Sequence, residues 1–272
     1  MTKHLKIFKA KSFLIRSTAS TTTPKVFKKI FNLLLLLLLL TACHTKKQYT
    51  QQRYPAYQIG IAPYQNEDSL SEAIIAPYRA PMAAKMQETI VVSQHEAVRG
   101  LPEGSLGNLV CDLLLEKATE IGPQKPDVCI MNSGGLRIDL PAGNISRSMI
   151  YELMPFENEL VLAEISGAGL LQLLKQIAAR GGAPVGGIRM KITPDGPSDI
   201  YIGNNPLDTI YVYKLISSDY ILQGGDRFVI PPLKSSRYLN IKVRDALLET
   251  LEKKQIAGQT IKPQKDGRMV SE

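Results

Sequence analysis

The chain has 272 residues, a formal net charge of +8 and 44% hydrophobic residues. Residues 1–42 hold eight basic side chains and no acidic one, which is the whole excess of 33 Lys and Arg over 25 Asp and Glu. The rest of the chain is electrically balanced, so its charge excludes a basic surface of the kind that binds nucleic acid.

The first 42 residues are organised like a bacterial export signal. A basic segment precedes an apolar run over residues 30–40, which is 11 residues long and shorter than the roughly 20 that a membrane-spanning helix needs. The following Leu40-Thr-Ala-Cys43 resembles a lipobox. We therefore expect residues 1–42 to be a lipoprotein signal peptide and Cys43 to be lipidated. The mature chain would be held in the bacterial envelope, at the outer membrane or in the periplasm, by its lipid alone.

The mature chain is expected to start with a flexible tether over residues 43–65. This stretch is rich in Gln, Tyr, Thr and Pro and has few aliphatic residues. It cannot bury enough apolar surface to offset the entropy lost on ordering. Residues 66–272 are then predicted to form the folded domain.

A helix is predicted at the start of this domain. From Ser69, apolar residues recur every four positions, a pattern that favours a helix on one side of the core. We expect Pro77 and Pro81 to bend or break it. The apolar positions are Leu70, Ile74, Tyr78, Met82 and Met86.

The following elements alternate between helix and strand. A short strand is predicted over 90–92, and a helix capped by Ser105 is predicted to run to Gly122-Pro123. A buried strand follows over 128–131. Further helices are predicted from Ser146 to Leu153, from Ser166 to Gly181, and across 243–251, and further strands over 160–165, 188–192, 200–202 and 209–216. Because no regular βαβ rhythm appears, the pattern predicts an α+β fold with mixed sheets.

Asn132-Ser-Gly-Gly-Leu-Arg137 follows the predicted buried strand. Glycines let backbone N–H groups approach a ligand closely, and Arg137 can offer two parallel hydrogen bonds to an anionic oxygen. The motif thus suits a phosphate or carboxylate. A glycine turn beside a solvated arginine is the alternative that the motif alone leaves open.

Two motifs further along the chain favour the ligand-binding interpretation of the Asn132–Arg137 motif. Together with Pro155-Phe-Glu-Asn158 and Gly224-Gly-Asp226, the motif resembles the C-terminal, substrate-binding domain of the 5'-nucleotidases. The resemblance covers roughly Thr89–Val229 and includes Leu106-Gly-Asn108, Asp112 and Ser166-Gly167. It implies a role in nucleotide catabolism, with a nucleotide or nucleoside as ligand. The residues that it assigns to substrate binding are Asn132, Gly134, Gly135, Arg137, Phe156, Asn158, Tyr220 and Asp226.

The resemblance also assigns roles to these residues. Phe156 and Tyr220 are expected to stack on the two faces of the base, and Asn158 to contact its edge. Asp226 is expected to accept hydrogen bonds from the ribose, with Asn132 and Arg137 on the phosphate side. From their sequence context alone, a loop Phe packed into the core and a turn-forming Asp remain the alternatives.

The chain departs from the family pattern at two positions. Gly100 stands three residues before Glu103, where many members have a second phosphate-binding arginine. Arg99 is adjacent, but the sequence does not give its direction. Arg227 replaces the glycine that usually follows the motif aspartate, and a left-handed backbone there would be strained.

The resemblance further implies a disulfide between Cys111 and Cys129. Some members carry a bridge between these two places, and an exported protein meets an oxidising environment. Both cysteines are flanked by aliphatic residues, so two buried free thiols are the alternative.

Catalytic groups are not evident in the mature chain. The family's catalytic domain resembles calcineurin-type phosphatases and holds two metals, whereas the histidines after the signal are His44 and His95. We expect this chain to bind no cofactor, no metal and no nucleic acid, and to act as an enzyme only with a separate metallophosphatase chain that holds the divalent metals. The alternatives are a non-catalytic nucleoside- or nucleotide-binding envelope lipoprotein and a structural lipoprotein that has lost the pocket.

Overall fold

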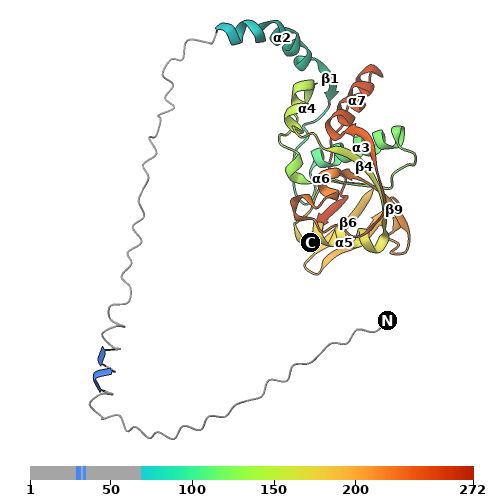
Figure 1. Ribbon diagram of the computed structural model, residues 1–272. Helices are drawn as coiled ribbons and strands as arrows, with labels where there is room; N and C mark the ends of the chain where they lie inside the picture. Colours follow the sequence, from blue (N-terminus) through green and yellow to red (C-terminus); the bar gives the residue numbers. More distant parts are fainter. Residues whose placement is uncertain (1–28, 32, 35–68) are drawn as a thin grey trace, which may run out of the picture. The chain divides into compact units, whose positions relative to one another are not determined.

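The computed structural model describes residues 29–31, 33–34 and 69–272 (Figure 1). The chain divides into two units, Met1–Tyr64 and Gln65–Glu272. In the first unit the described residues are helical and exposed. Cys43, the tether over 43–65 and most of the signal over 1–42 lie outside the described residues. Among the helices that are described, none combines the length and the apolar character needed to cross a membrane. All elements below belong to the second unit.

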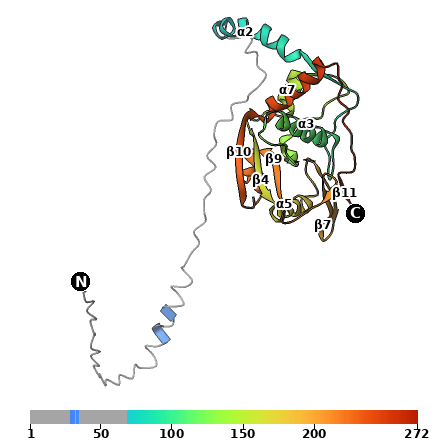
Figure 2. The ribbon, with the colours of Figure 1, turned by 90° about the vertical axis from the view of Figure 1, so that its right-hand side faces the viewer.

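A five-stranded sheet forms the centre of this unit, with its strands in the order β10-β4-β9-β2-β5. Strand β9 pairs in parallel with β2, and the other neighbours are antiparallel. Figure 2 shows β10, β4 and β9 side by side at one edge. The strands are β10 (Leu233–Lys242), β4 (Glu159–Ser166), β9 (Val212–Ser218), β2 (Val128–Ile130) and β5 (Val185–Gly186).

Both faces of the central sheet are covered. Successive strand residues point to opposite faces, so Cys129 and Ile216 join the core that also contains α3 (Ser105–Ile121) and α7 (Val243–Ile256). Their neighbours Ile130 and Leu215 join a second core, which contains α5 (Gly167–Ala179) and a second sheet. The sheet therefore separates two apolar cores, and β2, β4 and β9 are buried on both sides, whereas the edge strand β10 is mostly exposed.

The remaining strands form two smaller sheets. One has four strands in the order β11-β6-β7-β8, and in it β11 runs parallel to β6. The other pairs β1 with β3. The predicted α+β fold with mixed sheets is therefore confirmed. The elements are β11 (Met269–Ser271), β6 (Ile188–Thr193), β7 (Gly196–Ile202), β8 (Asn205–Pro206), β1 (Thr89–Ser93), β3 (Gly143–Ser146), the helices α4 (Arg147–Leu153) and α6 (Asp219–Leu222), and the 3₁₀ turns η1 (Ser133–Gly135) and η2 (Gly225–Arg227).

Helix α2 (Ser69–Gln87) differs from its prediction in two ways. It runs continuously through Pro77 and Pro81, so neither proline breaks it. Its apolar residues do not cover the core: Ile74, Tyr78 and Met82 are 64%, 69% and 59% exposed. The exposed carbonyls that the prolines leave unpaired can be solvated, which explains why a helix tolerates both here.

Of the three serines at predicted helix starts, Ser146 and Ser166 stand at the N-cap position, and one of them makes the capping hydrogen bond. The Ser166 hydroxyl accepts a hydrogen bond from the Gly169 N–H at 3.2 Å and so caps α5. Ser105 is instead the first residue of α3, and its hydroxyl accepts from the Val98 N–H at 2.9 Å. Ser146 stands at the N-cap position of α4, but its hydroxyl pairs with that of Ser148.

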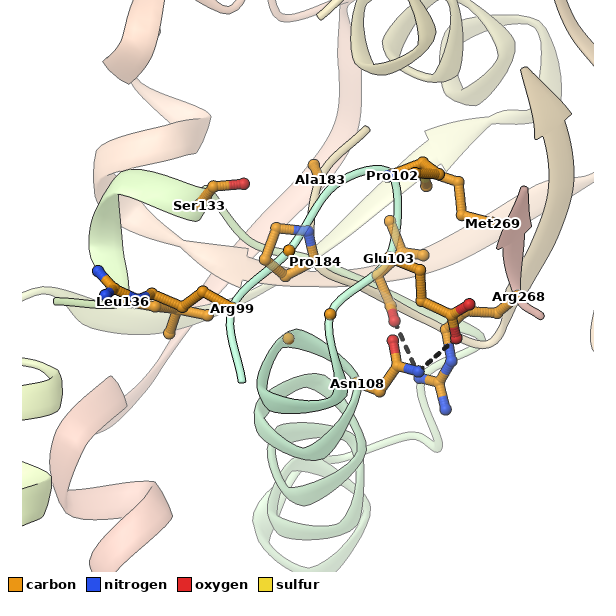
Figure 3. A pocket seen from close by; sticks show the side chains of 14 residues that line it. Arg99, Pro102, Glu103, Asn108, Ser133, Leu136, Ala183, Pro184, Arg268 and Met269 are labelled. Carbon is orange, nitrogen blue, oxygen red and sulfur yellow. Dashed lines mark hydrogen bonds between the residues drawn. The ribbon is translucent and has the colours of Figure 1, made fainter. Parts of the chain in front are cut away.

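A network of charged groups holds the C-terminal segment against α3. The buried Arg268 binds both carboxylate oxygens of Asp112, at 2.8 and 2.9 Å, and also binds Asp266. Glu103 accepts from Asn108 and from the backbone N–H groups of Asp266 and Gly267. Figure 3 shows Glu103, Asn108 and Arg268 together at one end of a small cavity. Glu103, Asn108 and Asp112, which the sequence links to the family pattern, thus stabilise the fold.

Replacing Arg268 with Met should lower the free energy of unfolding at pH 7 by about 2 kcal/mol, because it leaves carboxylates without their partner. The hydrogen bond from Arg268 lowers the pKa of Asp266. The stabilisation that this pair adds to the free energy of unfolding is therefore fully present above the ordinary aspartate pKa of about 3.9. It is lost as the pH falls through the lowered pKa of Asp266 in the folded protein. Urea unfolding at pH 7 and pH 3 should show the difference between wild type and R268M shrinking at low pH.

Arg237→Met is a matched control, since Arg237 is an exposed residue of the edge strand β10. Its unfolding should match wild type at both values of pH. A difference for R268M that is absent, or that is equal at pH 7 and pH 3, would contradict this account of the network.

Candidate functional site

One cavity is lined by every residue that the sequence assigns to substrate binding. Its volume is about 260 Å³, and its walls come from three stretches of chain, over 132–137, 156–158 and 220–226. The lining residues are Asn132, Gly134, Gly135, Arg137, Phe156, Asn158, Tyr220 and Asp226. The structure brings all eight together, while their contacts to a ligand remain predictions.

The central sheet explains why these three stretches meet. Strands β2 and β9 are parallel neighbours, so their carboxyl ends lie at the same end of the sheet. The segments that begin with Asn132 and Asp219 leave the sheet there. Strand β4 is antiparallel to β9, with Leu160 opposite Ser218. The start of β4 therefore lies at that same end of the sheet, and so does the loop before it, which carries Phe156 and Asn158.

Asp226 is held in the cavity wall by two side chains. One of its carboxylate oxygens accepts from the Asn132 side-chain amide at 2.7 Å and the other from the Tyr220 hydroxyl at 2.8 Å. The Tyr220 hydroxyl in turn accepts from the Asp226 N–H at 3.1 Å. A Cβ on Gly225 would lie 2.5 Å from the Tyr220 ring, so this turn requires glycine. The carboxylate is thus fixed in place before any ligand binds.

Phe156 and Tyr220 supply aromatic surface to the cavity. They are 41% and 42% exposed, which is unusual for residues that a globular protein normally buries. Phe156 is therefore not the core residue that its sequence context left as an alternative. Two accessible rings beside one cavity suit a flat, unsaturated ligand such as a nucleobase.

Asn158 lies beside these rings and is fixed by Asp219. Its side-chain N–H₂ donates to the Asp219 carboxylate at 3.1 Å, and the same oxygen accepts from the backbone N–H groups of Glu159 and Tyr220. No hydrogen bond within the described residues uses the Asn158 amide oxygen. That oxygen is an acceptor suited to an amino group on the edge of a base.

Arg137 is the cavity's positively charged lining residue. Its guanidinium carbon lies 5.9 Å from the centre of the Phe156 ring, and one N–H donates to the Gly134 carbonyl at 3.2 Å. Five N–H donors belong to a guanidinium, so most remain for a ligand. A phosphate beside the aromatic wall would meet this charge.

Arg99 does not line this cavity and is committed elsewhere. Its Nε donates to Asp139 at 2.9 Å, and one terminal N–H donates to the Arg137 backbone carbonyl at 2.9 Å. The Arg99 backbone N–H, followed by its side chain, lowers the pKa of Asp139. Figure 3 shows Arg99 extending away from Glu103 and Arg268. Arg99 thus braces the Arg137 segment; the sequence did not reveal this, because Asp139 is 40 residues away.

Cys111 and Cys129 are free thiols in the structure, so the predicted disulfide is not present in it. Both are buried on facing elements, α3 and β2. Burial, followed by the hydrogen bond that the Cys111 thiol makes with Cys129, raises the pKa of Cys111 well above its usual value. Such a thiol is a poor nucleophile. Thiol titration of the unreduced, denatured protein distinguishes the two forms.

Metal ligands do not gather in the described part of the chain. No group of three or more His, Cys, Asp and Glu residues there is arranged to hold a metal ion. His95, on the β1 side of the unit, is exposed. The described residues therefore do not fit a two-metal centre, and no hydrolytic step follows from them.

Comparison with known proteins identifies the family. The model for the C-terminal domain of 5'-nucleotidases matches residues 84–232, which confirms the resemblance seen in the sequence motifs. A 5'-nucleotidase of Vibrio parahaemolyticus is 30% identical over 129 residues, which are 46% of this chain and 22% of that protein. Protein UshA of Escherichia coli is 22% identical over 200 residues, 70% of this chain and 35% of that protein.

Solved structures share the fold. A 5'-nucleotidase precursor from Thermus thermophilus superposes with a TM-score of 0.63 at 22% identity, covering 75% of this chain and 43% of that one. The NAD nucleotidase NadN of Haemophilus influenzae gives a TM-score of 0.58 at 18% identity, over 75% and 42% of the two chains. The matches to two Vibrio 5'-nucleotidases span 22% and 27% of those proteins. Because the family model covers more than half of its 272 residues, the chain belongs to the 5'-nucleotidase C-terminal domain family.

Proposed function

We propose that this chain is the nucleotide-binding component of a 5'-nucleotidase-type phosphoesterase and that a separate metallophosphatase chain carries out the hydrolysis. The observation that carries the proposal is the cavity of about 260 Å³ in which all eight predicted substrate residues meet. A cavity built by three distant stretches of chain is unlike a chance match of short motifs.

The base would lie between Phe156 and Tyr220. Every base has a π-face, and stacking on an aromatic side chain is worth roughly 1–3 kcal/mol per base. This mode of binding is tolerant of base identity, and the Asn158 amide oxygen would add a contact at the edge. The Asp226 carboxylate, already oriented by Asn132 and Tyr220, would accept the ribose hydroxyls.

The phosphate would bind Arg137. The family's second arginine is replaced by Gly100, and Arg99 is paired with Asp139, so Arg99 does not replace its charge in the cavity. Instead Arg99 orients the Arg137 segment through the Arg137 carbonyl. One charged contact supports a moderate preference for nucleotides over nucleosides.

The metals would belong to the partner. Two-metal hydrolysis needs a clamp that activates water and stabilises the leaving oxygen, and no such cluster occurs among the described residues. This chain would hold the base and ribose and present the phosphate to the metals. Lipid attachment at Cys43 would keep the complex in the bacterial envelope, in line with the export signal over 1–42.

Phe156→Ala should weaken binding of AMP and adenosine by about tenfold or more, because it removes one face of the base-binding pocket, worth roughly 1–3 kcal/mol. Isothermal titration calorimetry measures this directly. Tyr201→Ala is the matched control, since Tyr201 is 42% exposed on β7 and does not line the cavity. Equal affinities for F156A and wild type would exclude the stacking role.

Arg99→Met should weaken AMP about fivefold and leave adenosine unchanged. The lost hydrogen bond to the Arg137 carbonyl, worth about 1 kcal/mol, frees the segment that carries the phosphate contact. Arg237→Met should change neither affinity. Equal loss of both ligands would mean that Arg99 maintains the whole pocket, and no loss of either would exclude the brace.

Hydrolysis should require the partner. The purified chain with added Mn²⁺ or Mg²⁺ should leave AMP intact, whereas co-expression with a calcineurin-like phosphatase of the same organism should give metal-dependent release of phosphate. In that complex F156A should raise KM. Hydrolysis by the chain alone would overturn the division of labour, and binding without hydrolysis in any complex would favour a non-catalytic nucleotide-binding lipoprotein.

A further inference from the structure

A second cavity borders the first on the far side of Asp226. Its volume is about 410 Å³, and it shares Asn132, Gly134 and Asp226 with the base-binding cavity. Two further arginines, Arg180 and Arg227, line it. Arg137 lines the first cavity and not the second, so different arginines supply the positive charge of each cavity.

Arg180 is fixed at this second cavity. Its guanidinium carbon lies 3.9 Å from the centre of the Phe228 ring, a close cation–π contact, and one terminal N–H donates to the Arg227 carbonyl at 2.9 Å. These two contacts orient the group and leave most of its donors unused. Arg180 follows the end of α5, and Phe228 follows η2, so two separate elements build the site.

Neither arginine is neutralised within the described chain. No ion pair there involves Arg180 or Arg227, although ten other basic residues form such pairs. The neighbouring Asp226 carboxylate accepts from Asn132 and Tyr220 and forms no ion pair with either arginine. The local balance of Arg180, Arg227 and Asp226 is therefore one net positive charge, which favours an anion.

The backbone conformation at Arg227 also supports an anion site here. Its φ is +60°, directly after Asp226 at +50°, and a side chain in the left-handed region is unfavourable. A glycine would adopt this conformation without strain, whereas the chain has an arginine, and this residue lines the second cavity.

We propose that Arg180 and Arg227 form a second anion subsite, which takes a phosphate carried on the 2' or 3' hydroxyl of the ribose. This rests on the proposed function, in which Asp226 faces the ribose hydroxyls. A 5'-phosphate would lie on the Arg137 side, so a group that passes Asp226 into the second cavity leaves the ribose at its 2' or 3' position. Two guanidinium groups offer charge-assisted hydrogen bonds to such a phosphate.

Calorimetric titration of the full chain with adenosine, 5'-AMP and 3'-AMP tests the assignment. Wild type should bind 3'-AMP more tightly than adenosine. Arg227→Gly should weaken 3'-AMP by about tenfold, the equivalent of one charge-assisted hydrogen bond, and leave adenosine and 5'-AMP within twofold. Glycine suits a φ of +60°, so this variant should fold normally. Arg180→Gln should act on the same ligand, and Arg237→Gln on none.

The outcomes separate this inference from the proposed function. Wild type that binds adenosine but gains nothing from a 3'-phosphate, or R227G that leaves 3'-AMP unchanged, overturns the second subsite alone. A loss confined to 5'-AMP overturns the assignment to the 2' or 3' position. Wild type that binds no adenosine contradicts the proposed function, and the subsite with it.

Discussion

Strand β9 lies between β4 and β2, parallel to β2 and antiparallel to β4. This pairing brings the carboxyl ends of β2 and β9 and the amino end of β4 to the same end of the sheet, where the cavity forms. A shift of one residue in either pairing would turn the side chains of the strand to the opposite face. Since β2, β4 and β9 are buried in separate cores on their two faces, the packing that stabilises the fold also fixes the geometry of the site.

Two carboxylates on either side of Tyr220 complete this arrangement. Asp219 joins the start of β4 to α6 through Asn158 and Glu159, and Asp226 joins Tyr220 to Asn132. The three stretches that line the cavity are thus tied to one another by side chains as well as by the sheet. Binding surfaces held in this way lose little conformational entropy when a ligand arrives.

The sequence predicted the cavity better than its surroundings. Short motifs keep their residue types at fixed spacings, so all eight lining positions followed from them, and α3, α5 and α7 followed from apolar periodicity. The strand β10 was missed because it is an edge strand with mostly exposed residues, which have no apolar alternation. Helix α2 was predicted from its apolar residues, but these residues are exposed. An apolar period predicts a helix and its apolar face, and it does not predict which element packs against that face. The direction of Arg99 depends on Asp139, a contact that no local pattern encodes.

The cavity is open to solvent at its aromatic and charged lining residues. Arg137, Phe156 and Tyr220 are all exposed, and Asp226, which orients Tyr220, lines the same cavity. Hydrolytic sites usually exclude bulk water as they close, because charged contacts strengthen when the surrounding water leaves. Under the proposed division of labour, a partner surface would have to cover the exposed phosphate side. The same closure would raise the strength of the single Arg137 contact, so the absence of a second arginine at Gly100 would matter less in the complex than in the isolated chain.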